Sequence, residues 1–183
     1  MKVKGIKKLN REVTKIISNL VGFKVKCKVG DTWISSNYSN KVWFSPIKTE
    51  VSTLQEEIWA EWCETRYNWK PNIMFMFSIL HEVGHLVTLQ DFMDNNPSEY
   101  LYSEDIEKEC DAESVELCKA GLIHSDVFKK VNLKYFSNPM ETIATDWAQV
   151  FYRTNLNKVE KAYIEITWAL KDWYEINDLQ GEE

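Results

Sequence analysis

Two of the three histidines in this chain lie in one short pattern that has the residue types of a metal site. His81 and His85 occur in His81-Glu82-Val83-Gly84-His85, an H-E-x-x-H arrangement. Positions i and i+4 lie one turn apart on the same helix face, so both imidazoles can point at one ion about 2.0–2.1 Å away. The pattern therefore predicts a zinc ion bound by His81 and His85.

Glu82 is the predicted general base of this site. It projects about 100° round the helix from His81, near the expected metal but off the line of the ligands. A carboxylate in that place can take a proton from metal-bound water. Gly84 leaves room for another element to pack closely against the helix. The alternative interpretation is a pair of core histidines with satisfied hydrogen bonds and a glutamate on the helix surface.

A catalytic zinc site usually has three protein ligands and one open position. A helix is expected to begin at Ser103, and at 100° per residue its apolar face includes Glu107 and Asp111 but not Glu109. A carboxylate in an apolar face is costly unless it is paired or bound to metal, which favours Glu107 as the third ligand. Asp111 can accept the free N–H of a ligating histidine. The other downstream candidates are Glu104, Glu109, Glu113, His124 and Glu141.

Glu141 has a competing structural explanation. It is the third helical position of Asn138-Pro139-Met140-Glu141, a capping-box pattern with proline at the first helical position. A capping role makes metal binding by its carboxylate a weaker expectation. Glu107 is the preferred third ligand, and Glu141 and His124 stay open as alternatives.

The residues from 81 to 111 resemble a known enzyme family. His81-Glu82-Val83-Gly84-His85 followed by Glu107-Lys108-Glu109-Cys110-Asp111 is similar to the gluzincin metallopeptidases, in which an H-E-x-x-H helix precedes a helix bearing E-x-x-x-D. The small cytosolic ImmA/IrrE-like branch is the nearest in size and layout, although that branch usually has alanine where Cys110 stands. The resemblance implies zinc ligands His81, His85 and Glu107, a general base Glu82 and an outer acceptor Asp111. It implies no particular substrate, since members of this branch often act on one partner protein, such as a repressor.

The elements that must position these residues follow from periodicity. Apolar residues at helical spacing predict an opening helix over 6–20, and alternation predicts a strand over 23–29, with two further strands over 32–35 and 41–44. These strands predict a small antiparallel sheet. Helices are expected over 53–64, 72–90, 103–121, 138–153 and 159–173, the second of them buried. The expected fold is α+β, a single zincin-like domain over 1–183 with a minimal sheet of about three strands.

Composition narrows the possible partners. The formal charge is −6, but residues 1–48 contain 11 Lys and Arg against Glu12 and Asp31, a net +9 that leaves −15 for the rest. Nucleic acid is therefore an improbable partner for the protein as a whole. Lys24, Lys26 and Lys28 on one strand face still form an alternative that predicts salt-dependent association with nucleic acid. No apolar run approaches the roughly 20 residues that cross a bilayer, and we expect a cytoplasmic protein that does not bind membranes.

The favoured activity is hydrolysis of peptide bonds in a protein partner by a zinc-activated water. The oxyanion of the reaction needs a further donor, for which Tyr100, Tyr102, Tyr135 and His124 are candidates. The alternative is a catalytically silent module that keeps the fold and acts by binding a protein partner. Substitution of Glu82 separates these two hypotheses.

Overall fold

The computed structural model describes residues 4–30, 34–37 and 40–177. Seven helices and three strands are formed there, so the described chain is mostly helical with a small sheet. In chain order they are α1 (Ile6–Val21), β1 (Lys26–Val29), β2 (Ile34–Asn37), β3 (Lys41–Phe44), α2 (Glu50–Tyr67), α3 (Met74–Asn95), α4 (Pro97–Lys119), α5 (Asp126–Phe136), α6 (Pro139–Thr154) and α7 (Leu156–Ile176).

The sheet is mixed, so the expectation of an antiparallel sheet was wrong. Its strand order is β1-β3-β2, with β1 parallel to β3 and β2 antiparallel to β3. The strand β3 lies between β1 and β2. In an antiparallel sheet of strands in chain order, β3 would instead lie at the outer edge, with β2 in the middle. Alternating hydrophobicity identifies a strand and its buried face, but it carries no information about which strand lies next to which. The residues 32 and 33 of the second predicted strand lie outside the described residues.

Helix α1 closes the outer edge of β1 with side chains. Thr14 Oγ1 donates to the Cys27 carbonyl and accepts from the Cys27 N–H, and Ser18 Oγ does the same for Val25. Asn10 Oδ1 accepts from the N–H of Val29. A four-residue helical step rises about 6.0 Å and a two-residue strand step about 6.6 Å, so the two repeats nearly match. This polar stripe of α1 therefore satisfies a strand edge that would otherwise be open to another chain.

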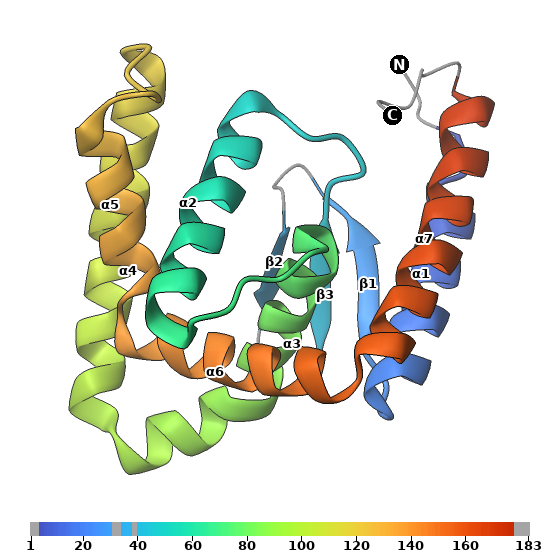
Figure 1. Ribbon diagram of the computed structural model, residues 1–183, viewed down its shortest axis with the longest axis horizontal. Coiled ribbons are helices and arrows are strands. Elements are labelled where there is room, and N and C mark those ends of the chain that lie inside the picture. The colour runs from blue at the N-terminus through green and yellow to red at the C-terminus, as the bar shows by residue number, and fades with distance from the viewer. Residues whose placement is uncertain (1–3, 31–33, 38–39, 178–183) are drawn as a thin grey trace.

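Helix α3 is the central element of the fold. It packs on one face of the sheet and is crossed by α6, while α1 and α7 pair at one side of the molecule and α4 and α5 at the other (Figure 1). Met76, Phe77, Ile79, Leu80 and Val83 of α3 are fully buried in the main core. This burial confirms the expectation that the helix carrying the two histidines lies inside the molecule.

The start of α4 differs from the sequence prediction in an informative way. Helix α4 begins at Pro97 instead of Ser103, and Ser103 is buried inside it, where its Oγ accepts from the N–H of Met140. Proline is favoured at the first helical position, and it starts this helix a turn and a half earlier than the serine. Ser103 thus connects α4 to the beginning of α6.

Among the helices of the described chain, none is long and apolar enough to cross a membrane.

Candidate metal centre

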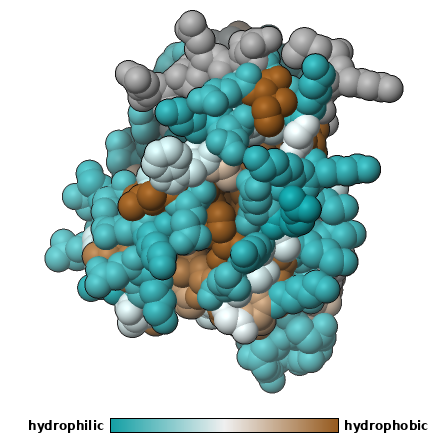
Figure 2. Space-filling view, turned by 90° about the vertical axis from the view of Figure 1, so that its right-hand side faces the viewer, coloured by the Kyte–Doolittle hydropathy of each residue, from teal (hydrophilic) through white to brown (hydrophobic). Residues whose placement is uncertain are grey.

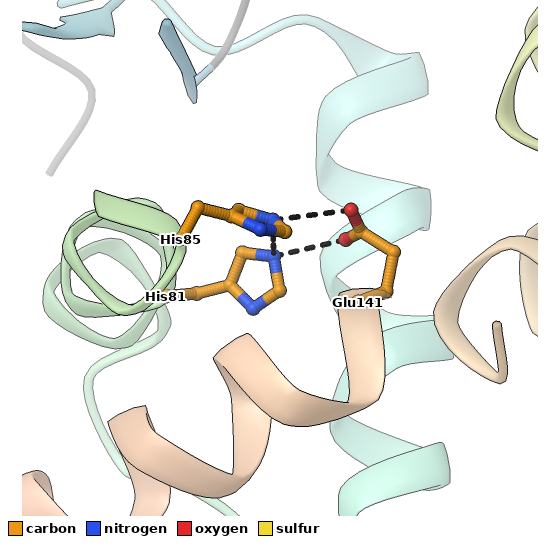
Figure 3. Close-up of side chains that lie close together, drawn as sticks. All are labelled: His81, His85 and Glu141. Carbon is orange, nitrogen blue, oxygen red and sulfur yellow. Dashed lines mark hydrogen bonds and ion pairs between the residues drawn. The ribbon is translucent and has the colours of Figure 1, made fainter. Parts of the chain in front are cut away.

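Helices α3 and α6 bring three metal-binding side chains together. Figure 3 shows His81 and His85 projecting from α3 toward Glu141 of α6. His81 Nε2 is 2.9 Å from Glu141 Oε2, His85 Nε2 is 3.1 Å from Glu141 Oε1, and the two Nε2 atoms are 3.1 Å apart. Within the described residues, this is the cluster of His, Cys, Asp and Glu side chains that could hold a metal ion.

Gly84 makes this approach of the two helices possible. A Cβ atom added at Gly84 would lie 2.5 Å from the carbonyl oxygen of Ala144, closer than real Cβ atoms come to other atoms. The sequence analysis expected Gly84 to admit a close neighbour, and the structure confirms this and identifies the neighbour as α6. Ala144 lies between Glu141 and Thr145 on α6. The contact at Gly84 therefore places Glu141 next to both histidines and Thr145 next to His81.

Thr145 holds the other ring nitrogen of His81. Its Oγ1 is 3.0 Å from His81 Nδ1, and its side chain is fully buried. Glu141 and Thr145 are one turn apart on α6, so a single helix contacts both nitrogens of one imidazole. If Nε2 bound a metal, Nδ1 would carry the ring hydrogen, and its N–H would donate a hydrogen bond to Thr145 Oγ1, which would fix both the tautomer and the ring orientation. The ring of Trp59 packs edge-on against His81, with 4.7 Å between centroids.

We expect Thr145→Val to weaken zinc binding by roughly 10- to 100-fold, the usual cost of removing a hydrogen-bond partner of a ligating histidine. Valine keeps the shape of threonine but leaves the buried N–H without an acceptor. Thr145→Ser keeps the hydroxyl and should retain most of the affinity. Competition with a fluorescent zinc chelator measures both variants. Equal affinities for wild type and Thr145→Val would contradict this role.

Glu107, the preferred third ligand from the sequence, lies next to Glu141 but is not part of the cluster. Its carboxylate is close enough to that of Glu141 to share a hydrogen bond, and its Oε1 is buried without a partner. Burial and the adjacent Glu141 charge raise the pKa of Glu107 to about 8. The helical-wheel argument thus placed Glu107 on the correct side of α4, but the structure puts Glu141 against the histidines.

Asp111 has a different position from the one expected of an outer acceptor. In the described part of the chain, no hydrogen bond joins Asp111 to either histidine, and the hydrogen-bond partner at His81 Nδ1 is Thr145. Partial burial and the Glu141 carboxylate both raise the pKa of Asp111, so it lies within electrostatic reach of the cluster. The physical reason is that α6 passes closer to α3 than α4 does, because the contact at Gly84 draws it in.

The charged groups of the cluster and its surroundings shift the pKa values of Glu141 and His85. Burial would raise the pKa of Glu141, but the imidazoles of His85 and His81 outweigh it and hold that pKa below its ordinary value. Burial would lower the pKa of His85, but Glu141, Glu82 and Glu107 together raise it to about 9. A metal ion must displace the proton on His85, so metal affinity should fall as the pH is lowered.

Glu82 and Tyr135 border the same centre. The charge of Glu82 acts on both His85 and Tyr135. Burial raises the pKa of Tyr135 well above its ordinary value, and the carboxylates of Glu141, Glu107, Glu82 and Asp111 raise it further. Tyr135, one of the proposed oxyanion donors, therefore lies within electrostatic reach of the carboxylates of the centre.

The remaining candidates from the sequence either have partners elsewhere or are exposed. His124 is exposed and pairs with Glu50 at 2.9 Å. Glu109 pairs with Lys134 at 2.8 Å, and Glu104 accepts a hydrogen bond from Tyr100. Glu113 is exposed, and Tyr102 is 59% exposed. None of these residues belongs to the cluster of His81, His85 and Glu141.

The donor set fits a zinc ion. Two imidazoles and one carboxylate are the ligands of a common catalytic zinc site, and tetrahedral ligands lie about 3.3 Å from one another. The nitrogen and oxygen atoms here are 2.9 to 3.1 Å apart, so a small outward shift would accommodate the ion. The buried unpartnered Oε1 of Glu107 and the accumulation of carboxylates around Glu141 also favour a bound cation.

Sequence reasoning missed Thr145 and gave Glu141 a different role. The Asn138 side chain does accept from the N–H of Glu141, as the capping pattern predicted, at 3.0 Å. The carboxylate of Glu141, however, turns toward the histidines instead of the helix start. The available signal was the spacing of Glu141, Ala144, Thr145 and Ala148, which puts two polar side chains beside two small residues on one helix face.

Comparisons of the chain with protein-family models, with curated proteins and with solved structures found no match.

Proposed function

We propose that this protein is a zinc-dependent peptidase with a minimal zincin-like fold, related to the ImmA/IrrE-like gluzincins and acting on a protein partner. The observation that carries the proposal is the convergence of His81, His85 and Glu141, with Glu82 beside them. Three protein ligands leave one position of a tetrahedral ion open for a water or a substrate, which is the arrangement of a catalytic zinc site.

His81, His85 and Glu141 would hold the metal, and Glu107 and Thr145 would support two of these ligands from outside. A bound zinc ion supplies Lewis acid chemistry, because it lowers the pKa of water toward about 7 and polarises a carbonyl group. Glu82 accepts the proton of the attacking water and passes it to the departing amine. Tyr135 donates a hydrogen bond to the oxyanion that forms on the scissile carbonyl, and its raised pKa keeps the phenol protonated at neutral pH.

An extended substrate could add to one edge of the sheet. Side chains of α1 already satisfy the outer edge of β1, and β3 lies in the middle of the sheet. The strand β2 is the other edge and packs against α3, the helix that carries His81 and His85. A peptide segment that adds to β2 would run beside the centre, with affinity from main-chain hydrogen bonds.

Glu82→Gln tests the proposal. Glutamine keeps the shape of the side chain but cannot take up the proton, so turnover should fall by roughly 10²- to 10⁴-fold while zinc stays bound. New protein N-termini are counted by mass spectrometry after a cell extract is incubated with the zinc-loaded protein. Glu113→Gln, the same change at an exposed position of α4, is the matched control and should behave as wild type.

The same experiment separates the enzyme from a silent binding module. A peptidase generates N-termini with wild type and with Glu113→Gln that are absent with Glu82→Gln. Identical sets of N-termini from wild type and Glu82→Gln, both with one zinc per chain by elemental analysis, would contradict catalysis and favour a module that acts by binding alone.

A further inference from the structure

The side of the sheet away from α3 is strongly basic. Val42 and Phe44 of β3 are fully buried, and the strands alternate, so Lys41 and Trp43 project from the opposite side. The register pairs Lys26 with Lys41 and Lys28 with Trp43, which places these four side chains together on that side. Lys28 Nζ lies 5.3 Å from the centre of the Trp43 ring.

Helix α1 extends this surface beyond the edge of β1. Its stripe of Asn10, Thr14 and Ser18 faces β1, and its apolar residues lie to one side of that stripe, in the core. At 100° per residue, Lys7, Arg11 and Lys15 lie on the other side of the stripe, next to the lysines of the sheet. We call the whole set the basic face; it consists of Lys7, Arg11, Lys15, Lys24, Lys26, Lys28 and Lys41. Figure 2 views the molecule from the side of α1 and α7, where hydrophilic side chains surround a narrower hydrophobic strip.

The cations of the basic face have no acidic partners in the described chain. Other lysines do, since Lys8 pairs with Asp172, Lys129 with Glu61 and Lys134 with Glu109. No ion pair recorded among the described residues involves any member of the basic face. No ion pair within the described chain balances this positive charge, and a negatively charged partner would balance it.

The residue types of the basic face fit a nucleic acid better than a protein. Centres of protein interfaces are depleted in lysine, whereas six of these seven cations are lysines. Lys26 and Lys28 lie two residues apart in β1, about 6.6 Å along the strand, and Lys24 precedes the strand by two residues. The three lysines can therefore follow a regularly charged backbone. Trp43 adds an aromatic ring among the cations. An open sheet surface that combines lysines with an aromatic side chain is typical of proteins that bind single strands.

We propose that the basic face binds single-stranded nucleic acid through its phosphates. The net charge of −6 argued against nucleic acid at the level of the whole sequence. Charges farther apart than about 8 Å are largely screened at physiological salt, so the local positive charge decides binding at this face. Because α3 packs on the opposite side of the sheet, the basic face is separate from the metal centre, and its function does not depend on the peptidase proposal.

The test measures binding of a fluorescein-labelled oligothymidine of roughly 20 nucleotides by fluorescence anisotropy over a range of salt concentrations. The full chain should bind with strong salt dependence. The triple variant Lys24→Gln, Lys26→Gln, Lys28→Gln should bind at least about tenfold more weakly at 0.1 M salt. Its log–log salt slope should be smaller by about 2, since each phosphate contact on a single strand contributes about 0.7.

A matched triple variant removes three exposed lysines that lie elsewhere. Lys130→Gln, Lys158→Gln, Lys161→Gln changes the net charge equally and should leave both the affinity and the salt slope near wild type. An equal loss in both triple variants would overturn the proposal, because net charge alone would then explain binding. Absence of binding at low salt would overturn it as well, as would equal competition by duplex DNA, by polyglutamate or by vesicles of anionic lipid.

Discussion

Glu141→Ala is expected to abolish stoichiometric zinc binding and, with it, all zinc-dependent turnover. Among the described residues, Glu141 carries the carboxylate that contacts both histidines, at 2.9 and 3.1 Å, so the substitution leaves two buried imidazoles as the ligands of the cluster. The loss of affinity should exceed the 10- to 100-fold that follows from removing an outer partner of a ligand. Elemental analysis after dialysis, together with chelator competition, measures the effect.

Glu107→Ala is the matched control for this prediction. Glu107 contacts Glu141 and not the histidines, so its removal should cost only about 10- to 100-fold in zinc affinity. Secondary structure by circular dichroism should be preserved in both variants, which shows that the metal and not the fold has been lost. A larger loss for Glu107→Ala than for Glu141→Ala would return Glu107 to the place of the third ligand, where the sequence analysis had put it.

Gly84→Ala is expected to destabilise the protein by about 3 kcal/mol or more, although alanine favours helices by about 1 kcal/mol over glycine. The added Cβ would lie 2.5 Å from the carbonyl oxygen of Ala144. This oxygen belongs to the backbone of α6, so it cannot move out of the way by a change of rotamer as a side chain could. Helix α6 would have to move outward, carrying Glu141 and Thr145 away from His81. We therefore expect a lower urea midpoint in the presence of chelator and a weakened zinc site in the same variant.

Gly30→Ala provides the comparison. A Cβ at Gly30 would lie 3.4 Å from side-chain atoms of Trp43, near an ordinary contact, so this variant should unfold close to the wild-type urea concentration. Ala144→Gly should not rescue Gly84→Ala, because the conflict is with the carbonyl oxygen and not with the methyl group. A Gly84→Ala protein as stable as wild type would show that the two helices do not approach as closely as the structure has them.

The sequence by itself determined the features that depend on a few neighbouring residues. The spacing of His81 and His85 places both rings on one helix face whatever surrounds the helix. The periodicity from Ile6 to Leu20 predicted α1 to within one residue, and the capping of α6 by Asn138 is also local. Such features follow from backbone geometry and hydrogen bonds within about one turn of the chain.

Only the tertiary structure decided which distant groups meet. Both α4 and α6 carry a glutamate near the histidines, and the sequence could rank them by burial cost but not by distance. The outcome depends on the contact between Gly84 and Ala144, which are 60 residues apart and whose close approach brings Glu141 and Thr145 into place. The order of the strands was undetermined for the same reason. Pairing over long separations depends on the packing of whole elements, which local patterns of residues do not encode.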